Sequence, residues 1–148
     1  MLPNPWDAGS ASVLAGLGFK ALATTSSGYA WSCARADGQL SRAETLAHLR
    51  AMVAATDLPV NADFESGFAD TPEGVAESVR MAVETGVAGI SIEDSTGDPR
   101  SPLRGVEESI QRRRRGPRST QPAATPCWWD VRRISSWAVP ISTMPSCA

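Results

Sequence analysis

Two acidic residues stand just after two successive predicted strands, and they carry the clearest chemical signal in the sequence. Asp63 follows a short apolar run from Leu58 to Val60, and Glu93 follows a second run from Val87 to Ile92. Strands joined by a crossover helix run parallel, so their carboxyl ends meet at one edge of a sheet. Carboxylate oxygens gathered at such an edge suit Mg²⁺ better than Zn²⁺. The alternative is that each acid only caps the helix that follows it.

The segment between the two acids has the signals of that crossover helix. Thr71 is placed to cap it, Pro72 takes its first position, and Gly86 ends it. Valine recurs every four residues on one face, at Val75, Val79 and Val83. The pattern therefore predicts a strand, a helix and a parallel strand.

Two further helices are predicted upstream. Ser41 and Glu44 form a capping box for a helix that runs to about Ala55. Its one histidine, His48, lies far from any strand end, which indicates a surface or packing role. A shorter helix is predicted from Gly9 to Leu17, after a strand that ends near Trp6 and Asp7.

A small polar loop follows another predicted strand, which begins near Ala21. The loop contains Thr25, Ser26 and Ser27. Backbone N–H groups and hydroxyls in such a loop can hold a carboxylate or a phosphate. The same residues are also ordinary turn formers, so a purely structural role is the alternative.

Several short motifs occur in an order that resembles a known family. They are NPWDAGSA at 4–11, NAD at 61–63 followed by GF at 67–68, and SIED at 91–94. Together they resemble the isocitrate lyase/phosphoenolpyruvate mutase family from about Leu2 to Asp98. Each motif is weak alone, but the combination is specific.

The resemblance implies a (β/α)₈ barrel with Mg²⁺ at the C-terminal mouth, holding a 2-oxo acid or an enolpyruvate-type substrate. Asp63 is similar to the family's direct metal ligand, Glu93 to its second acidic position, and Asp37 to an acid that reaches the metal through water. Asn61 stands where many members have Asp, and its amide can still orient a metal-bound water. The loop at 25–27 matches the one that holds the substrate's carboxylate.

The resemblance also bears on the reaction. The family's lyases carry a reactive cysteine after the strand that ends here at Glu93, and residues 95–102 contain none. No catalytic acid or base is therefore assigned. We expect Mg²⁺ to stabilise an enolate when a C–C or P–C bond breaks, as in decarboxylation or phosphonate chemistry. Glu65 is a candidate to support the metal, although a solvated loop acid is the favoured interpretation.

Length limits the predicted architecture. The chain has 148 residues, whereas a complete barrel of this kind needs about 250. The expected fold is therefore α/β, a partial (β/α)₈ TIM barrel of about the first four βα units in residues 1–110, plus an irregular basic tail in 111–148. The first strand begins close to Met1, where family members carry a preceding segment.

Charge separates the tail from the rest. Residues 1–110 hold 7 Lys and Arg against 15 Asp and Glu, and residues 111–148 hold 7 against 1. Arg112 to Arg115, with tryptophans further on, could form a nucleic-acid patch. We favour a different origin, a frameshift near residues 104–118. Shifted by one base, GC-rich codons from Cys127 onward can read V-L-V-G-R-A-E-N-F, which resembles the family's next strand.

These observations leave two classes of function. One is a Mg²⁺-dependent lyase or phosphonomutase whose present copy is truncated and inactive. The other is a non-catalytic fragment or a binding protein with a basic Arg/Trp tail. The expected partner is a small carboxylate substrate, with no membrane, no favoured nucleic acid, and a homo-oligomer possible by family. Three cysteines, an odd count, and no signal peptide indicate a reduced, cytoplasmic protein.

Overall fold

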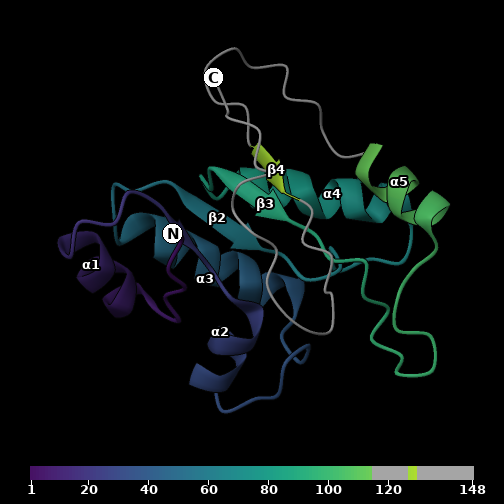
Figure 1. Cartoon of the computed structure of the whole chain (residues 1–148), viewed down its shortest axis with the longest axis horizontal. Helices are drawn as coiled ribbons and strands as arrows, with labels where there is room; N and C mark the ends of the chain where they lie inside the picture. Colours follow the sequence, from purple (N-terminus) through teal and green to yellow (C-terminus); the bar gives the residue numbers. More distant parts are fainter. Residues whose placement is uncertain (115–126, 130–148) are drawn as a thin grey trace.

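The computed structural model describes residues 1–114 and 127–129. Helices and strands alternate along most of this part of the chain (Figure 1). In chain order the elements are α1 (Ala8–Gly16), β1 (Leu22–Ala23), α2 (Ser26–Ser32), α3 (Arg42–Ala54), β2 (Val60–Asp63), α4 (Pro72–Val83), β3 (Gly89–Ser91), α5 (Val106–Arg114) and β4 (Cys127–Trp129).

The strands form one parallel sheet in the order β1-β2-β3-β4. Asn61 is in register with Gly89, and Asp63 is in register with Ser91. The carboxyl ends of β2 and β3 therefore lie at the same edge, as predicted. The α/β class with a parallel sheet is confirmed, while the number of βα units in a barrel stays a prediction.

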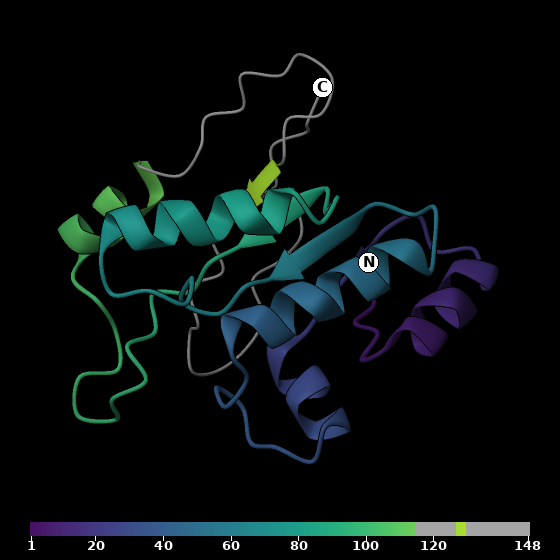
Figure 2. The ribbon, with the colours of Figure 1, turned by 180° about the vertical axis from the view of Figure 1, so that it is seen from behind.

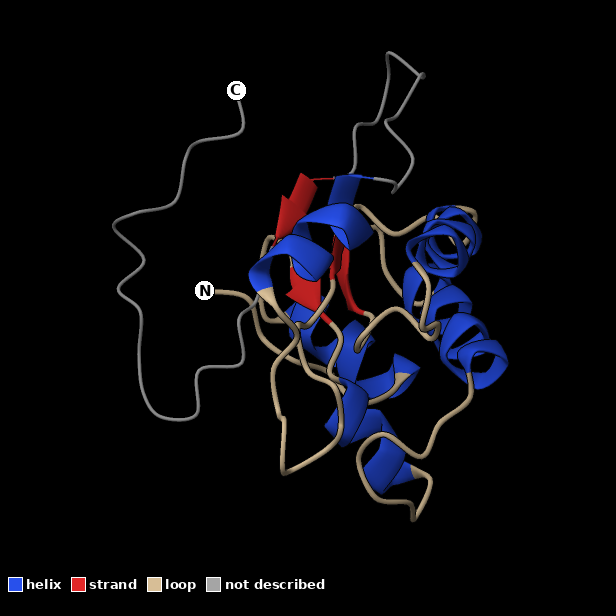
Figure 3. Cartoon of the chain, turned by 90° about the vertical axis from the view of Figure 1, so that its right-hand side faces the viewer, coloured by secondary structure: helices blue, strands red, loops and turns tan. Residues whose placement is uncertain are grey.

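Helices α3 and α4 pack side by side along one face of the sheet (Figure 2). The core between them holds apolar side chains from both layers, among them Leu49 of α3, Val79 of α4 and Ile90 of β3. Phe64, directly after β2, is fully buried in the same cluster. Figure 3 shows the strands with these helices packed beside them. This packing fixes the ends of β2 and β3 relative to each other.

The helix starts follow the capping chemistry of the sequence. Thr71 accepts a hydrogen bond from the Gly74 N–H, with Pro72 at the first turn. Ser41 and Glu44 form a capping box at α3. A second capping box, which the sequence analysis missed, joins Asp7 and Ser10 at α1. These local bonds satisfy N–H groups that have no partner inside a helix.

The structure differs from the predictions at both ends. The expected strand near Trp6 and Asp7 is absent from the described residues, although the Ala23 N–H donates to the Pro3 carbonyl at 3.1 Å. The predicted boundary at residue 110 falls inside α5, and β4 lies beside β3 in parallel. Both elements differ from the prediction of a tail without helix or strand. The rest of that tail, 115–126 and 130–148, lies outside the described residues.

Among residues 1–114 and 127–129, no helix is both long enough and apolar enough to cross a bilayer.

Candidate functional site

The Asp63 side chain is held in place at the end of β2. The Ser26 N–H donates to its Oδ2 at 2.9 Å, and the Glu65 N–H donates to Oδ1 at 3.4 Å. The Asp63 N–H itself donates to the Thr24 hydroxyl at 2.9 Å. These contacts tie the carboxylate to the ends of both β1 and β2. Each oxygen keeps a further lone pair, so the carboxylate is oriented without being saturated.

The predicted polar loop begins a helix. Thr25 is the N-cap of α2, where its hydroxyl accepts from the Gly28 N–H at 3.4 Å. The hydroxyls of Thr25 and Ser27 lie 3.2 Å apart and share a hydrogen bond. Only Ser26 of the three lines the pocket described next. Two of the three predicted substrate-binding residues are therefore engaged in holding the turn.

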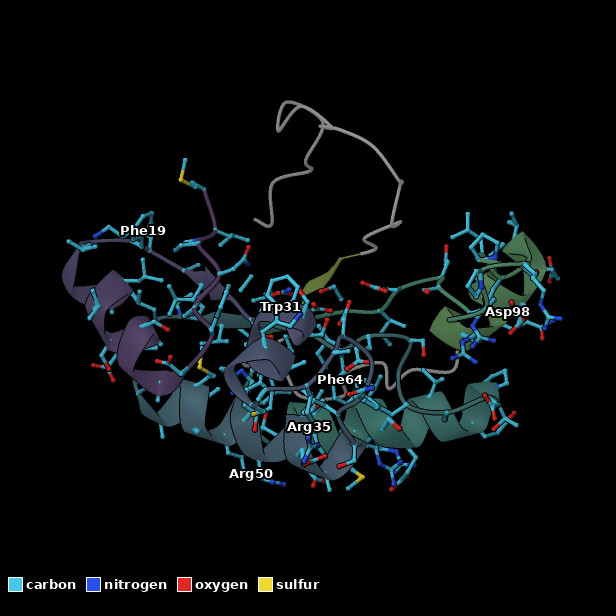
Figure 4. All side chains as sticks on the ribbon, turned by 90° about the horizontal axis from the view of Figure 1, so that it is seen from below. Phe19, Trp31, Arg35, Arg50, Phe64 and Asp98 are labelled. Carbon is cyan, nitrogen blue, oxygen red and sulfur yellow. The ribbon has the colours of Figure 1, made fainter. Side chains whose placement is uncertain are left out.

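A pocket of about 460 Å³ opens beside these strand ends. Its lining residues come from four segments of the chain: Ser26, Asp37, Gly38, Glu65, Ser66, Glu93, Ser95, Thr96 and Gly97. Two residues close to the lining in sequence, Arg35 before Asp37 and Asp98 after Gly97, lie in different parts of the molecule (Figure 4). The pocket thus brings together two predicted metal residues, Asp37 and Glu93, from separate loops.

Glu65 differs from its predicted role as a solvated loop acid. It lines the pocket and is partly buried. Burial, and then the negative charges of Asp37, Asp63 and Glu93, raise the pKa of its carboxyl group to about 7. Its Oε1 atom is buried with no hydrogen-bond partner among the described residues. The signal in the sequence was its position two residues after Asp63, beyond the same strand.

Backbone contacts link Glu65 to Glu93. The Glu93 N–H donates to the Glu65 carbonyl at 2.7 Å, and the Phe64 N–H donates to the Ser91 carbonyl at 3.0 Å. The pairing of β2 with β3 therefore continues past the assigned strands. Both acids leave the sheet at neighbouring positions because of it.

Asn61 lies two residues before Asp63 on β2, so the two residues share one face of the strand. Its amide donates to the Ser91 hydroxyl at 3.2 Å, and that hydroxyl donates to the Ala62 carbonyl at 3.0 Å. The Asn61 Oδ1 atom is buried and has no partner among the described residues. A buried amide oxygen in that state can accept a hydrogen bond from a water molecule.

The donor set fits a hard divalent cation. Three acids and several hydroxyls line the pocket, and none of its described lining residues is Lys or Arg. The buried Glu65 oxygen needs a positive or hydrogen-bonding partner. The acidic side chains do not converge on one point: within the described ranges, no group of three or more His, Cys, Asp or Glu is arranged to hold a metal ion. The three acids therefore have the right ligand chemistry for a divalent cation, but they are farther apart than the ligands of a formed metal site.

Comparison with known proteins gives a consistent result. The family model described as phosphoenolpyruvate phosphomutase matches residues 1–126. A candidate lyase/mutase from Burkholderia cenocepacia is 50% identical, with a TM-score of 0.73 over 75% of this chain and 40% of that one. An uncharacterized protein of Mycobacterium tuberculosis is 36% identical over 98 residues, which are 66% of this chain and 37% of that protein.

A third similarity concerns the fold alone. A phosphonopyruvate hydrolase, solved in complex with oxalate and Mg²⁺, is 23% identical with a TM-score of 0.71 over 75% of this chain and 40% of that one. The chain therefore spans about two fifths of the length of the relatives it matches.

Proposed function

The chain belongs to the phosphoenolpyruvate phosphomutase family, and on that premise we propose that it carries the metal-binding part of a Mg²⁺-dependent lyase or phosphonomutase. The substrate class would be a 2-oxo acid or a phosphoenolpyruvate-like compound. The observation that carries the proposal is the acidic pocket at the carboxyl edge of the sheet, which Asp37, Glu65 and Glu93 line. Asp63, two residues before Glu65, is not among the lining residues, and its carboxylate accepts from the Glu65 N–H. Active sites of barrel enzymes lie at this edge.

The acids have distinct places in this proposal. Asp63, whose orientation two backbone amides fix, is the direct ligand of the cation. Glu93 and Asp37 line the pocket from separate loops and would hold the cation or its water molecules. Asn61 orients one such water through its buried amide oxygen. The cation, when bound, polarises a substrate oxygen and stabilises negative charge on it.

Hydroxyl groups serve the substrate. Ser26, Ser66 and Ser95 line the same pocket, and their hydroxyls can donate to carboxylate oxygens, whereas the Thr96 hydroxyl already donates to the Ser101 carbonyl. Thr25 and Ser27 hold the turn that presents Ser26. A reaction that breaks a C–C or P–C bond and leaves an enolate needs this combination of a cation and fixed donors.

The lack of a thiol beside the pocket supports one reaction class within this proposal. The segment 95–102 contains no cysteine, and Cys33 is exposed outside the pocket lining. Decarboxylation of an oxaloacetate-like acid, or phosphonate chemistry, therefore fits better than cleavage of an isocitrate-like substrate with a thiol acid.

Calorimetric titration with Mg²⁺, and then with oxalate as a substrate-like dicarboxylate, tests the proposal. Wild-type protein should bind Mg²⁺, and oxalate should bind only when Mg²⁺ is present. Asp63→Asn and Glu93→Gln should each weaken Mg²⁺ binding at least tenfold, because each removes a charged ligand. Asp57→Asn is a matched control, since Asp57 is exposed and outside the pocket. Absence of Mg²⁺ binding in the wild type would refute the proposal.

A second candidate function is that of a non-catalytic fragment. The small share of each relative's length that this chain covers is the reason to propose it. The chain spans about two fifths of their length, so later parts of a complete barrel are not represented in the match. We propose that this copy holds the cation without turnover, and that a frameshift explains the basic tail. Assays with 2-oxo acids and Mg²⁺ distinguish the two, because turnover by the 148-residue chain supports a working enzyme.

A further inference from the structure

Arg112 of α5 is buried, although it begins a run of four arginines. Only 3% of the surface of the whole residue is exposed to solvent. A guanidinium group that is removed from water needs partners for its N–H groups. Its partners show what the residue does for the fold.

The Arg112 guanidinium binds three backbone carbonyls of one loop. Nη1 donates to Asp70 at 2.8 Å, and Nη2 donates to Ser66 at 2.7 Å and to Ala69 at 2.8 Å. All three acceptors belong to the segment 64–71, here called the β2–α4 loop. No side-chain carboxylate takes part in these three bonds. The contact therefore depends on the backbone conformation of the loop and not on its side chains.

The β2–α4 loop has a backbone that needs such support. Glu65, Gly67 and Phe68 have positive φ angles of 48°, 85° and 54°. The two non-glycine residues are strained in this region, so the surrounding contacts have to stabilise it. At Gly67 a side chain would also meet Val75, since a Cβ would lie 3.0 Å from its Cγ1. The loop therefore has a restricted backbone conformation, and the hydrogen bonds from Arg112 stabilise it.

The β2–α4 loop in this conformation forms one wall of the acidic pocket. Ser66, whose carbonyl Arg112 binds, lines the pocket together with Glu65. The Glu65 carbonyl in turn accepts from the Glu93 N–H at 2.7 Å. A shift of the loop would therefore move Glu65 directly and Glu93 through that bond.

We propose that Arg112 is a positioning residue for the pocket, which holds the β2–α4 loop so that Glu65, Ser66 and Glu93 face one cavity. As far as it concerns cation binding, the inference rests on the proposed function. It also gives residues beyond 110 a defined role, since α5 packs beside α4 and reaches back to the end of β2 (Figure 1). A planar fork that spans three carbonyls is a task for Arg, and Lys, with a compact ammonium group, cannot reproduce it.

Hydrogen exchange of single-site variants tests the loop. In Arg112→Lys and Arg112→Ala, the amides of residues 64–71 should exchange at least tenfold faster, while those in the middle of α3 keep wild-type rates. A purely global loss of stability would instead accelerate exchange throughout the core. Gln111→Ala is the matched control, because Gln111 is the exposed neighbour on the same helix. Wild-type exchange of 64–71 in both Arg112 variants would overturn the proposal.

Binding of Mn²⁺, followed by electron paramagnetic resonance, tests the consequence for the pocket. Arg112→Lys should weaken Mn²⁺ binding about tenfold, and Gln111→Ala should leave it unchanged. Unchanged affinity in Arg112→Lys would overturn the positioning role. If the wild-type chain binds no Mn²⁺, the proposed function fails, and the exchange data alone decide whether Arg112 holds the loop.

A wild-type measurement covers the case in which the variants do not fold. Native-state exchange in low denaturant should show the β2–α4 loop and α5 opening together, with the same dependence on denaturant concentration. Opening of the loop at lower denaturant, while α5 stays protected, would contradict the proposal.

Discussion

Glu65 brings a fourth carboxylate into a partly buried position beside Asp37, Asp63 and Glu93, which raises its pKa to about 7. We predict that Glu65→Gln stabilises the metal-free protein by about 1–2 kcal/mol at pH 8, because it removes a repelled, partly desolvated charge. The same change should reduce the rise in melting temperature that Mg²⁺ produces. Urea unfolding with and without Mg²⁺ measures both effects. A less stable metal-free variant would contradict the account.

His48 gives a prediction about acid stability. It stacks on Tyr29 with ring centroids 3.7 Å apart, is 7% exposed, and has a buried Nε2 without a partner among the described residues. Burial lowers its pKa from 6.5 to about 4, against a smaller opposing effect of Asp7. Because the unfolded chain takes up the proton first, stability is full above pH 6.5 and is lost as the pH falls toward 4.

The matched variant for this effect is His48→Phe, which keeps a ring on Tyr29 and cannot titrate. Relative to it, the wild type should lose about 2–3 kcal/mol of unfolding free energy between pH 7 and pH 4. Denaturant unfolding at several pH values measures the difference. A difference that does not change with pH would mean that His48 is not buried in neutral form.

At the level of single residues, the sequence predicts position where the order of local elements determines it, and the role of those residues in a metal site stays a prediction. Asp63 and Glu93 could be predicted to share an edge, since each follows a strand of a βα unit. The sequence predicts a solvated Glu65, because nothing local shows that its loop turns back through positive φ angles. Arg112 was grouped with a charge run, and its burial depends on contacts with residues more than 40 positions away.

Among the elements, α4 offers the simplest test of how the sequence encodes the crossover between the two acidic strand ends. Its N-cap Thr71 accepts from the Gly74 N–H at 3.2 Å. Thr71→Ala should lower the unfolding free energy by about 1 kcal/mol, and Thr71→Ser should retain most of it, because the serine hydroxyl can accept the same bond. Urea denaturation compares the three proteins. Equal losses in both variants would contradict a capping role.

Elements with strong local signals were predicted well. Helices α3 and α4 have caps at their starts and, in α4, valines at helical spacing, and both appear close to their predicted bounds. The strand expected near Trp6 did not appear, since that segment only contacts β1 through a few bonds. Helix α5 extends into the basic run because Arg112 finds buried partners there, a contact that composition alone could not predict.

For the whole molecule, the origin of the basic tail remains a prediction. The chain matches its family model over residues 1–126, and the tail has a charge opposite to the rest. If a base was lost or gained near codons 104–118, resequencing the coding DNA should show family-like sequence in the neighbouring frame beyond codon 127. A confirmed frame, with no such sequence in the neighbouring one, would contradict this and favour a binding role for the tail.

The central claim is that the acids at the carboxyl edge of the sheet hold one divalent cation. Anomalous diffraction from crystals grown with Mn²⁺ in place of Mg²⁺ tests it most directly. We predict a single strong peak in the pocket lined by Asp37, Glu65 and Glu93, about 2.2 Å from a carboxylate oxygen of Asp63 or Glu93. No peak there, or a peak only at unrelated surface acids, would contradict the account.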